Sequence, residues 1–142
     1  MNTIICTMSS INDRLYDMIA YTRSYALELF ESTNINCHFE SAENIPPTEM
    51  SGEKRRNIFL CVKESLNNIS KHSKADDVWI KVTILHGSAD IQIHDNGVGI
   101  TMQKLRESGN GRNNMKKRIE SIEGRFTIVN NYFTTTIISV PL

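Results

Sequence analysis

The chain has 142 residues, which is enough for one domain with a buried core. Its 16 basic and 16 acidic side chains give a net charge of zero, which argues against a nucleic-acid partner or contact with an anionic membrane. No apolar run in the sequence approaches the ~20 residues that span a bilayer. Three widely spaced cysteines without a CxxC motif indicate neither zinc nor disulfides, and we therefore expect a reducing, cytoplasmic location.

A long helix is predicted near the start of the chain. Residues 1–9 have no clear periodicity, and Ser10 or Asn12 can cap a helix that runs to about Thr33. Thr22 is the one polar residue on the apolar stripe of this helix, which comprises Leu15, Met18, Ile19, Ala26 and Leu29.

A short strand and a loop separate this helix from the next one. Apolar and polar residues alternate from Ile35 to Phe39, as they do in a half-buried strand. Pro46-Pro47 marks a loop, and Ser51 after it is suited to cap the following helix.

The stretch from Asn57 to Ala75 is predicted to form one long helix with two different faces. Its apolar face is a stripe of residues at spacings of three and four: Ile58, Val62, Leu66 and Ile69. Roughly opposite this stripe lie Glu64, Asn68 and Lys71, with His72 one turn past Asn68. A carboxylate, an amide oxygen and a cation in one row could face a magnesium-bound phosphate, although a polar face is also the ordinary property of a surface helix.

The second half of the chain is richer in strands. The expected elements are, in order, a strand at 78–84, a turn at 86–88, a strand ending at Asp95, a helix marked by Met115, Ile119 and Ile122 and closed by Gly124, a strand from Phe126, a turn at Asn130-Asn131, and a strand at 133–140. Most sequential strands are joined by turns that are too short for a crossover. We therefore expect an α+β fold, a two-layer α/β sandwich whose mixed, mostly antiparallel sheet has helices on one face.

The first of two glycine-bearing stretches, residues 94–100 with the sequence HDNGVGI, could bind a ligand. Asp95 stands at the very end of an apolar strand, where it could accept a hydrogen bond from a ligand amine. Gly97 and Gly99 let the backbone turn sharply and approach a ligand closely. The alternative is an ordinary Asp-Asn-Gly turn.

The second glycine-bearing stretch, residues 108–115 with the sequence SGNGRNNM, directly precedes a predicted helix. Backbone N–H groups and the dipole at such a helix N-terminus favour phosphate. The alternative is a flexible loop before a helix. Between the two stretches, Thr101 to Glu107 could act as a small lid.

Taken together and in this order, the polar helix row and the two glycine-bearing stretches resemble the ATP-binding fold shared by DNA gyrase, the ninety-kilodalton chaperone, histidine kinases and mismatch-repair ATPases. The closest resemblance is to the catalytic domain of bacterial sensor histidine kinases of the nitrate-sensor and desaturase-sensor type. It is carried by VKESLNNISKHSKA, by the short lid, by GNGRNNMKKR with Arg118, and by the closing TTTIISVPL. The resemblance covers residues 10–142, and we expect residues 1–9 to be the remnant of an upstream linker.

The resemblance implies that the chain binds ATP with Mg²⁺. Asn68 would be the metal ligand, and Asp95 would accept a hydrogen bond from the adenine amino group. Glu64 corresponds to the general base of the family's ATPases; in a kinase whose acceptor histidine lies on another domain, it would instead position water or metal. Lys71 and His72 would lie near the phosphates or the ribose.

The rest of the nucleotide site implied by the resemblance comes from the two glycine-bearing stretches, with Gly97 and Gly99 bordering the base and the second stretch cradling the phosphates. The full set is Gly97, Gly99, Ile100, Gly109, Gly111, Arg112, Asn114 and Met115. One departure is Arg112, where the family usually has leucine. Arg112 either adds a phosphate contact or points to solvent.

The expected function is donation of the γ-phosphoryl group of ATP to a histidine on a separate dimerisation domain, in two-component signal transduction. The kinases of this group carry that histidine upstream, on a dimerising helical pair, and none of the four histidines of this chain stands in such a helix. The implied partners are this phosphoacceptor domain and a downstream response regulator, with no nucleic acid and no membrane contact. The location would be cytoplasmic, including as the cytoplasmic part of a membrane-anchored sensor.

Two other functions remain open on the same fold. One is a free-standing serine kinase that binds an anti-anti-sigma partner, against which the N-terminal helix and strand argue, because they resemble a sensor-kinase linker. The other is a nucleotide-binding module without turnover, against which the presence of Glu64, Asn68 and Asp95 argues.

Overall fold

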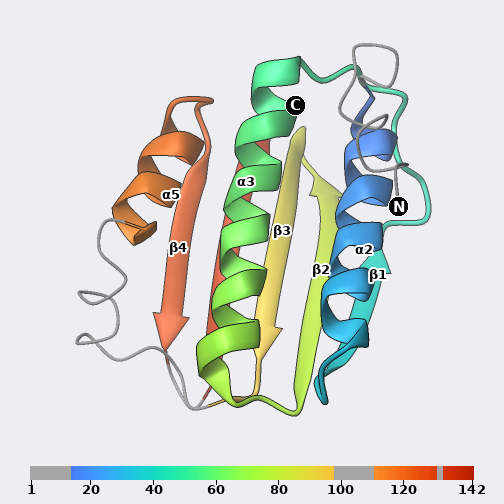
Figure 1. Ribbon diagram of the computed structural model, residues 1–142. Coiled ribbons are helices and arrows are strands. Elements are labelled where there is room, and N and C mark those ends of the chain that lie inside the picture. Colours follow the sequence, from blue (N-terminus) through green and yellow to red (C-terminus); the bar gives the residue numbers. More distant parts are fainter. Residues whose placement is uncertain (1–13, 98–110, 131–132) are drawn as a thin grey trace.

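A five-stranded sheet with helices on one face makes up the computed structural model, which describes residues 14–97, 111–130 and 133–142 (Figure 1). The elements in chain order are α2 (Leu15–Glu31), β1 (Asn36–Ser41), α3 (Gly52–Asn68), the π-helix η1 (Ile69–Ser73), β2 (Asp77–Leu85), β3 (Ser88–Asp95), α5 (Gly111–Glu120), β4 (Arg125–Asn130) and β5 (Thr134–Pro141). None of the helices within these ranges is long and apolar enough to cross a membrane.

The sheet has the strand order β1-β2-β3-β5-β4. β1 runs parallel to β2, and the other neighbouring strands are antiparallel. The parallel pair is possible because α3 lies between β1 and β2 in the chain and provides the crossover. The predicted mixed, mostly antiparallel sheet with helices on one face is therefore confirmed.

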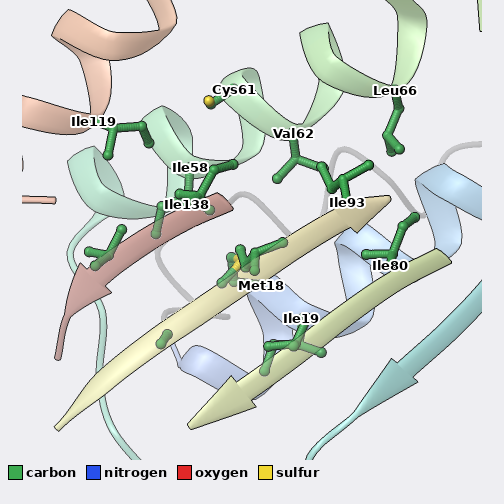
Figure 2. Packing of buried hydrophobic residues seen from close by; sticks show 14 of the residues in the cluster. Met18, Ile19, Ile58, Cys61, Val62, Leu66, Ile80, Ile93, Ile119 and Ile138 are labelled. Atoms are coloured by element: carbon green, nitrogen blue, oxygen red, sulfur yellow. The ribbon is translucent and has the colours of Figure 1, made fainter. Parts of the chain in front are cut away.

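The core lies between the sheet and its helices. Strand residues at alternate positions, among them Ile80, Ile93 and Ile138, point toward the apolar stripe of α3 (Figure 2). On α3 the predicted stripe residues Ile58, Val62 and Leu66 are fully buried, as is Cys61 beside them, and Ile69 is 7 % exposed. The alternating apolar residues of the strands and the apolar stripe of α3 thus pack against each other across a single interface.

Helix α2 begins later than the sequence predicts. Its N-cap is Arg14, which is extended and forms an isolated β-bridge with Glu49, and the backbone N–H of Leu15 donates to Thr48 O at 2.9 Å. The expected caps Ser10 and Asn12 lie outside the described residues. Pairing with the loop before α3 fixes the chain at Arg14, so α2 starts directly after it.

Thr22, the one polar residue on the apolar stripe of α2, forms its hydrogen bond within the helix. Thr22 is 1 % exposed, and its hydroxyl donates a hydrogen bond of 2.8 Å to Met18 O. A buried hydroxyl without a partner would be costly, so this bond explains why threonine is tolerated at a core position.

Helix α3 starts as predicted, but its end differs from the prediction of one regular helix up to Ala75. Ser51 is the N-cap, and its side chain accepts a hydrogen bond of 3.2 Å from the Lys54 N–H. The α-helical geometry stops at Asn68, the chain continues as the π-helix η1, and Lys74 ends it in the left-handed conformation with φ 54°. Spacings of three and four cannot reveal a wider turn of this kind, which is frequent at functional sites.

Gly124 follows α5 as predicted, but it serves a different purpose from a left-handed cap. The left-handed residue is Glu123, with φ 64°, and the Gly124 N–H donates to Ile119 O at 2.9 Å. A Cβ added at Gly124 would lie 2.7 Å from Ile119 Cγ2 and 2.8 Å from Ser139 O. Glycine is therefore needed here because α5 and β5 approach the backbone closely.

We expect Gly124→Ala to destabilise the fold by about 1–3 kcal/mol, the usual cost of forcing an extra methyl group into a packed region. Gly52→Ala is the matched control, because among the described residues a Cβ there would meet only Arg55 Nη2 at 3.6 Å, an ordinary contact. Urea unfolding of both variants measures the effect. Equal free energies of unfolding for Gly124→Ala and the wild type would contradict the close approach.

Candidate functional site

One face of α3 is turned toward α5. Asn57 Nδ2 donates to Ser121 Oγ at 3.3 Å, and Arg118 Nη1 donates to Asn57 Oδ1 at 3.3 Å. Two turns later along α3, Ser65 Oγ lies 3.6 Å from Met115 Sδ. The two helices therefore run antiparallel, and α5 begins beside the second half of α3.

Glu64 and Asn68 continue this α5-facing row. They stand seven and eleven residues after Asn57, and at 3.6 residues per turn both return to within about 20° of its direction. Glu64 is exposed and Asn68 is half-buried, one turn apart. The structure thus places a carboxylate and an amide oxygen on the side where α5 starts, and hard oxygen donors of this kind fit Mg²⁺.

Lys71 and His72 both lie in η1 and are exposed. The α-helical spacing that put Lys71 in one row with Glu64 and Asn68 does not hold there, because a π-helix has more residues per turn. Both residues remain on the last turn before β2, at the same end of α3 as Asn68.

Asp95 is the last residue of β3 and is 2 % exposed. It pairs with Val78 of β2 and with Thr134 of β5, so it lies on an inner strand of the sheet. It is buried like Ile93 and Ile91 before it, which confirms the inward direction that alternation predicts.

The Asp95 carboxylate has one partner from its own turn. Its Oδ1 accepts a hydrogen bond of 2.9 Å from the Gly97 N–H. Burial raises the pKa of the Asp95 carboxyl, and this hydrogen bond and the nearby His94 act in the opposite direction. The hydrogen bond expected for an ordinary Asp-Asn-Gly turn is therefore present, and the Asp95 carboxylate that accepts it is also buried.

Asn96 is a residue whose role the sequence did not reveal. Its Oδ1 accepts hydrogen bonds of 2.9 Å from both the Asp76 and the Asp77 N–H groups. Its own N–H donates to Asp77 O at 3.3 Å. Asn96 thereby ties the end of β3 to the start of β2 and holds the chain that follows Asp95; the only signal in the sequence was an asparagine in a turn.

The predicted site residues that the structure describes gather at one end of the sandwich. Figure 1 shows the C-terminal end of α3 and the end of β3 at the same end of the sheet, while α5 begins farther along the sheet, beside the second half of α3. Gly111 is the first residue of α5, so this helix begins inside the stretch 108–115 that was predicted to precede it. Asn114 is exposed and Met115 is buried. Gly99, Ile100, Gly109 and the expected lid at 101–107 lie outside the described residues, as does the side chain of Arg112.

Residues 53–142 match the family described as Histidine kinase-, DNA gyrase B-, and HSP90-like ATPase. The chain belongs to this ATPase family. The family predicted from the three motifs is thus confirmed, and membership supports ATP as the ligand.

Relatives of this ATPase-family chain include sensor kinases. "Sensor histidine kinase YvfT" of Bacillus subtilis (strain 168) is 30 % identical over 114 residues, which are 80 % of this chain and 30 % of that protein. "Nitrate/nitrite sensor protein NarQ" of Escherichia coli (strain K12) is 27 % identical over 97 residues, 68 % of this chain and 17 % of that protein. The chain therefore spans less than a third of the length of these curated relatives.

The fold of this ATPase-family chain is also found in solved structures. The histidine kinase domain from the Erythrobacter litoralis EL346 blue-light activated histidine kinase has a TM-score of 0.73 and 19 % identity, and the match covers 88 % of this chain and 61 % of that one. The α+β sandwich is therefore the fold of a histidine kinase domain.

Proposed function

We propose that this chain is the ATP-binding catalytic domain of a sensor histidine kinase. It binds Mg-ATP and donates the γ-phosphoryl group to a histidine on a separate dimerisation domain, which is its partner together with a downstream response regulator. The observation that carries the proposal is the placement of Glu64 and Asn68 on the α5-facing side of α3, at the same end of the sandwich as the buried Asp95. The domain would comprise residues 10–142, after a linker remnant at 1–9, in the cytoplasm.

The base is recognised by Asp95 in this proposal. Its Oδ1 is occupied by the Gly97 N–H, which leaves Oδ2 for the adenine amino group. A buried carboxylate needs donors, and a ligand amine supplies one. Gly97 and Gly99 would border the base.

Asn68 and Glu64 would hold Mg²⁺ together with the phosphates, since Mg²⁺ usually takes one or two protein oxygens and keeps several waters. When bound, the ion neutralises charge on the transferring phosphoryl group. Glu64 positions water around this site, because the nucleophile is a histidine of another domain.

The phosphates would lie at the start of α5. The exposed Asn113 and Asn114 lie in its first turn, and the exposed Lys116 follows in the next one. Free backbone N–H groups at a helix N-terminus and nearby cations attract phosphate. Gly111 is the first residue of this helix.

The four histidines of the chain lie in β1, in η1, in the turn between β2 and β3, and in β3. None of these is a dimerising helix, and the acceptor must therefore come from elsewhere. The relative YvfT is named a sensor histidine kinase, which favours this assignment over a free-standing serine kinase or a module without turnover.

We expect the isolated chain to bind ATP with Mg²⁺ but not to phosphorylate itself. With radiolabelled ATP, label should appear only when the dimerisation domain of the same kinase is added, and it should reside on that domain. A dimerisation domain whose acceptor histidine is replaced by alanine is the control. Stable label on a histidine of this chain alone would overturn the proposal.

A further inference from the structure

Helix α2 is joined to α3 by a small aromatic cluster. The rings of Tyr21 and Tyr25 both meet Phe59 edge-on, with centroids 4.4 Å and 5.4 Å away and interplanar angles of 66° and 87°. Phe59 and Asn67 both contact Tyr25, so these two residues of α3 lie on the side of the helix that faces α2. The cluster and Asn67 therefore belong to one contact region between the two helices.

Asn67 is held firmly by this neighbour. Its Nδ2 donates one hydrogen bond of 2.8 Å to the Tyr25 hydroxyl oxygen and another of 2.8 Å to Lys63 O. An amide nitrogen has two hydrogens, so both are directed by these bonds. The side chain of Asn67 is thus anchored toward α2.

The anchored residue stands next to the proposed metal ligand. Asn68 follows Asn67 by one residue, about 100° around the helix, and so faces the α5 side. Asn68 is also the last residue of α-helical geometry before η1. Where the backbone hydrogen bonds change from the α to the π pattern, they fix the rotation of the helical turn less strictly. A side-chain anchor at this point therefore helps to set that rotation.

We propose that the hydrogen bond between Tyr25 and Asn67 is a positioning contact that sets the rotation of the last α-helical turn and thereby aims Asn68 at the metal-nucleotide site. This inference rests on the proposed function. Tyr25 and Asn67 are positioning residues, since neither faces the site itself. Because Tyr25 belongs to α2, a displacement of α2 along α3 is transmitted to Asn68 through two side chains.

The test compares Tyr25→Phe with Tyr21→Phe. The first change keeps the ring against Phe59 and removes only the hydroxyl that accepts from Asn67; the second removes a hydroxyl from the same cluster, one turn away. ATP affinity is measured by calorimetry with Mg²⁺ and with a chelator. We expect Tyr25→Phe to reduce the gain in affinity from Mg²⁺ by about threefold to tenfold, the worth of one hydrogen bond. Affinity without metal and both affinities of Tyr21→Phe should stay at the wild-type values.

A second variant and a second readout keep the test independent of folding defects. Asn67→Ala should lower the gain from Mg²⁺ as Tyr25→Phe does, and the double variant should be no worse than either, because both remove one bond. In the nucleotide-free protein, amide hydrogen exchange at 69–73 should be faster in Tyr25→Phe than in Tyr21→Phe.

The outcomes separate the inference from the function on which it rests. An unchanged gain from Mg²⁺ in Tyr25→Phe and Asn67→Ala, or equal losses with and without metal, would overturn the positioning role and leave the proposed function in place. A wild-type protein that binds ATP without any gain from Mg²⁺ would overturn the metal site, and the positioning role with it.

Discussion

Replacing Asn68 by alanine is expected to abolish magnesium-dependent binding of ATP and to leave the fold intact. The side-chain amide oxygen is lost, while the position is half-buried on the polar side of α3, away from the core stripe of Val62 and Leu66. Alanine also favours the helix. We expect Mg-ATP affinity to fall by at least about tenfold, or about 1.4 kcal/mol, with a change in unfolding free energy of no more than about 0.5 kcal/mol.

The matched control for this prediction is Asn44→Ala, which makes the same chemical change at an exposed position in the loop before α3. This loop enters the opposite end of the helix from Asn68. Calorimetry with and without Mg²⁺, together with thermal unfolding, covers both readouts. Wild-type Mg-ATP affinity in Asn68→Ala would remove Asn68 from the metal site.

The sequence was informative wherever one side of an element is buried. In β2 and β3 every second residue is apolar, so the pattern predicts both the strands and the side chains that point into the core. The inward direction of Asp95 followed from Ile91 and Ile93 alone. The stripe of α3 indicated its core face for the same reason. Helical periodicity alone therefore assigned Glu64 and Asn68 to the opposite, polar side of this helix.

The helix boundaries predicted from the sequence differ from the structure where tertiary contacts override local signals. Ser10 and Asn12 are good caps, yet the bridge between Arg14 and Glu49 sets the start of α2. The change from α3 to η1 after Asn68 leaves no trace in a pattern of threes and fours.

Partners distant in the sequence were equally hidden. The bond from Asn67 to Tyr25 spans 42 positions, and that from Asn96 to Asp77 spans 19. Neither could be found without the arrangement of the sheet and helices. The roles of Gly99, Ile100 and Gly109 stay predictions, since these residues lie outside the described ranges.

Asp95→Asn is expected to weaken ATP binding by about 1.5–3 kcal/mol, the range for a hydrogen bond to a charged group. In the wild type, Oδ1 accepts from the Gly97 N–H and Oδ2 is expected to accept from the adenine amino group. Asparagine has one oxygen, so the turn and the base cannot both be satisfied, and its NH₂ group would face the adenine amine. Guanine presents a carbonyl oxygen at the corresponding position, so GTP should not bind the wild-type protein.

The competing interpretation is that Asp95 only caps the turn through Gly97, and asparagine serves turns as well as aspartate does. ATP and GTP titrations of both proteins decide between the two. Equal ATP affinity in the wild type and Asp95→Asn, or GTP binding as tight as ATP in the wild type, would refute recognition of adenine by Asp95.

The pH dependence provides an independent check on the same carboxylate. Burial raises the pKa of Asp95 above its ordinary value of 3.8, so on acidification the acceptor is protonated, and ATP affinity lost, at a higher pH than for an exposed aspartate. A raised pKa in the folded state means that protonation of Asp95 stabilises the fold, and this contribution is fully present below the unfolded pKa and lost as pH rises through the folded pKa. Loss of ATP affinity on acidification therefore cannot come from unfolding driven by this group. Asp95→Asn, which does not titrate, should lack this part of the pH profile, and an identical profile in both proteins would assign the dependence to another group.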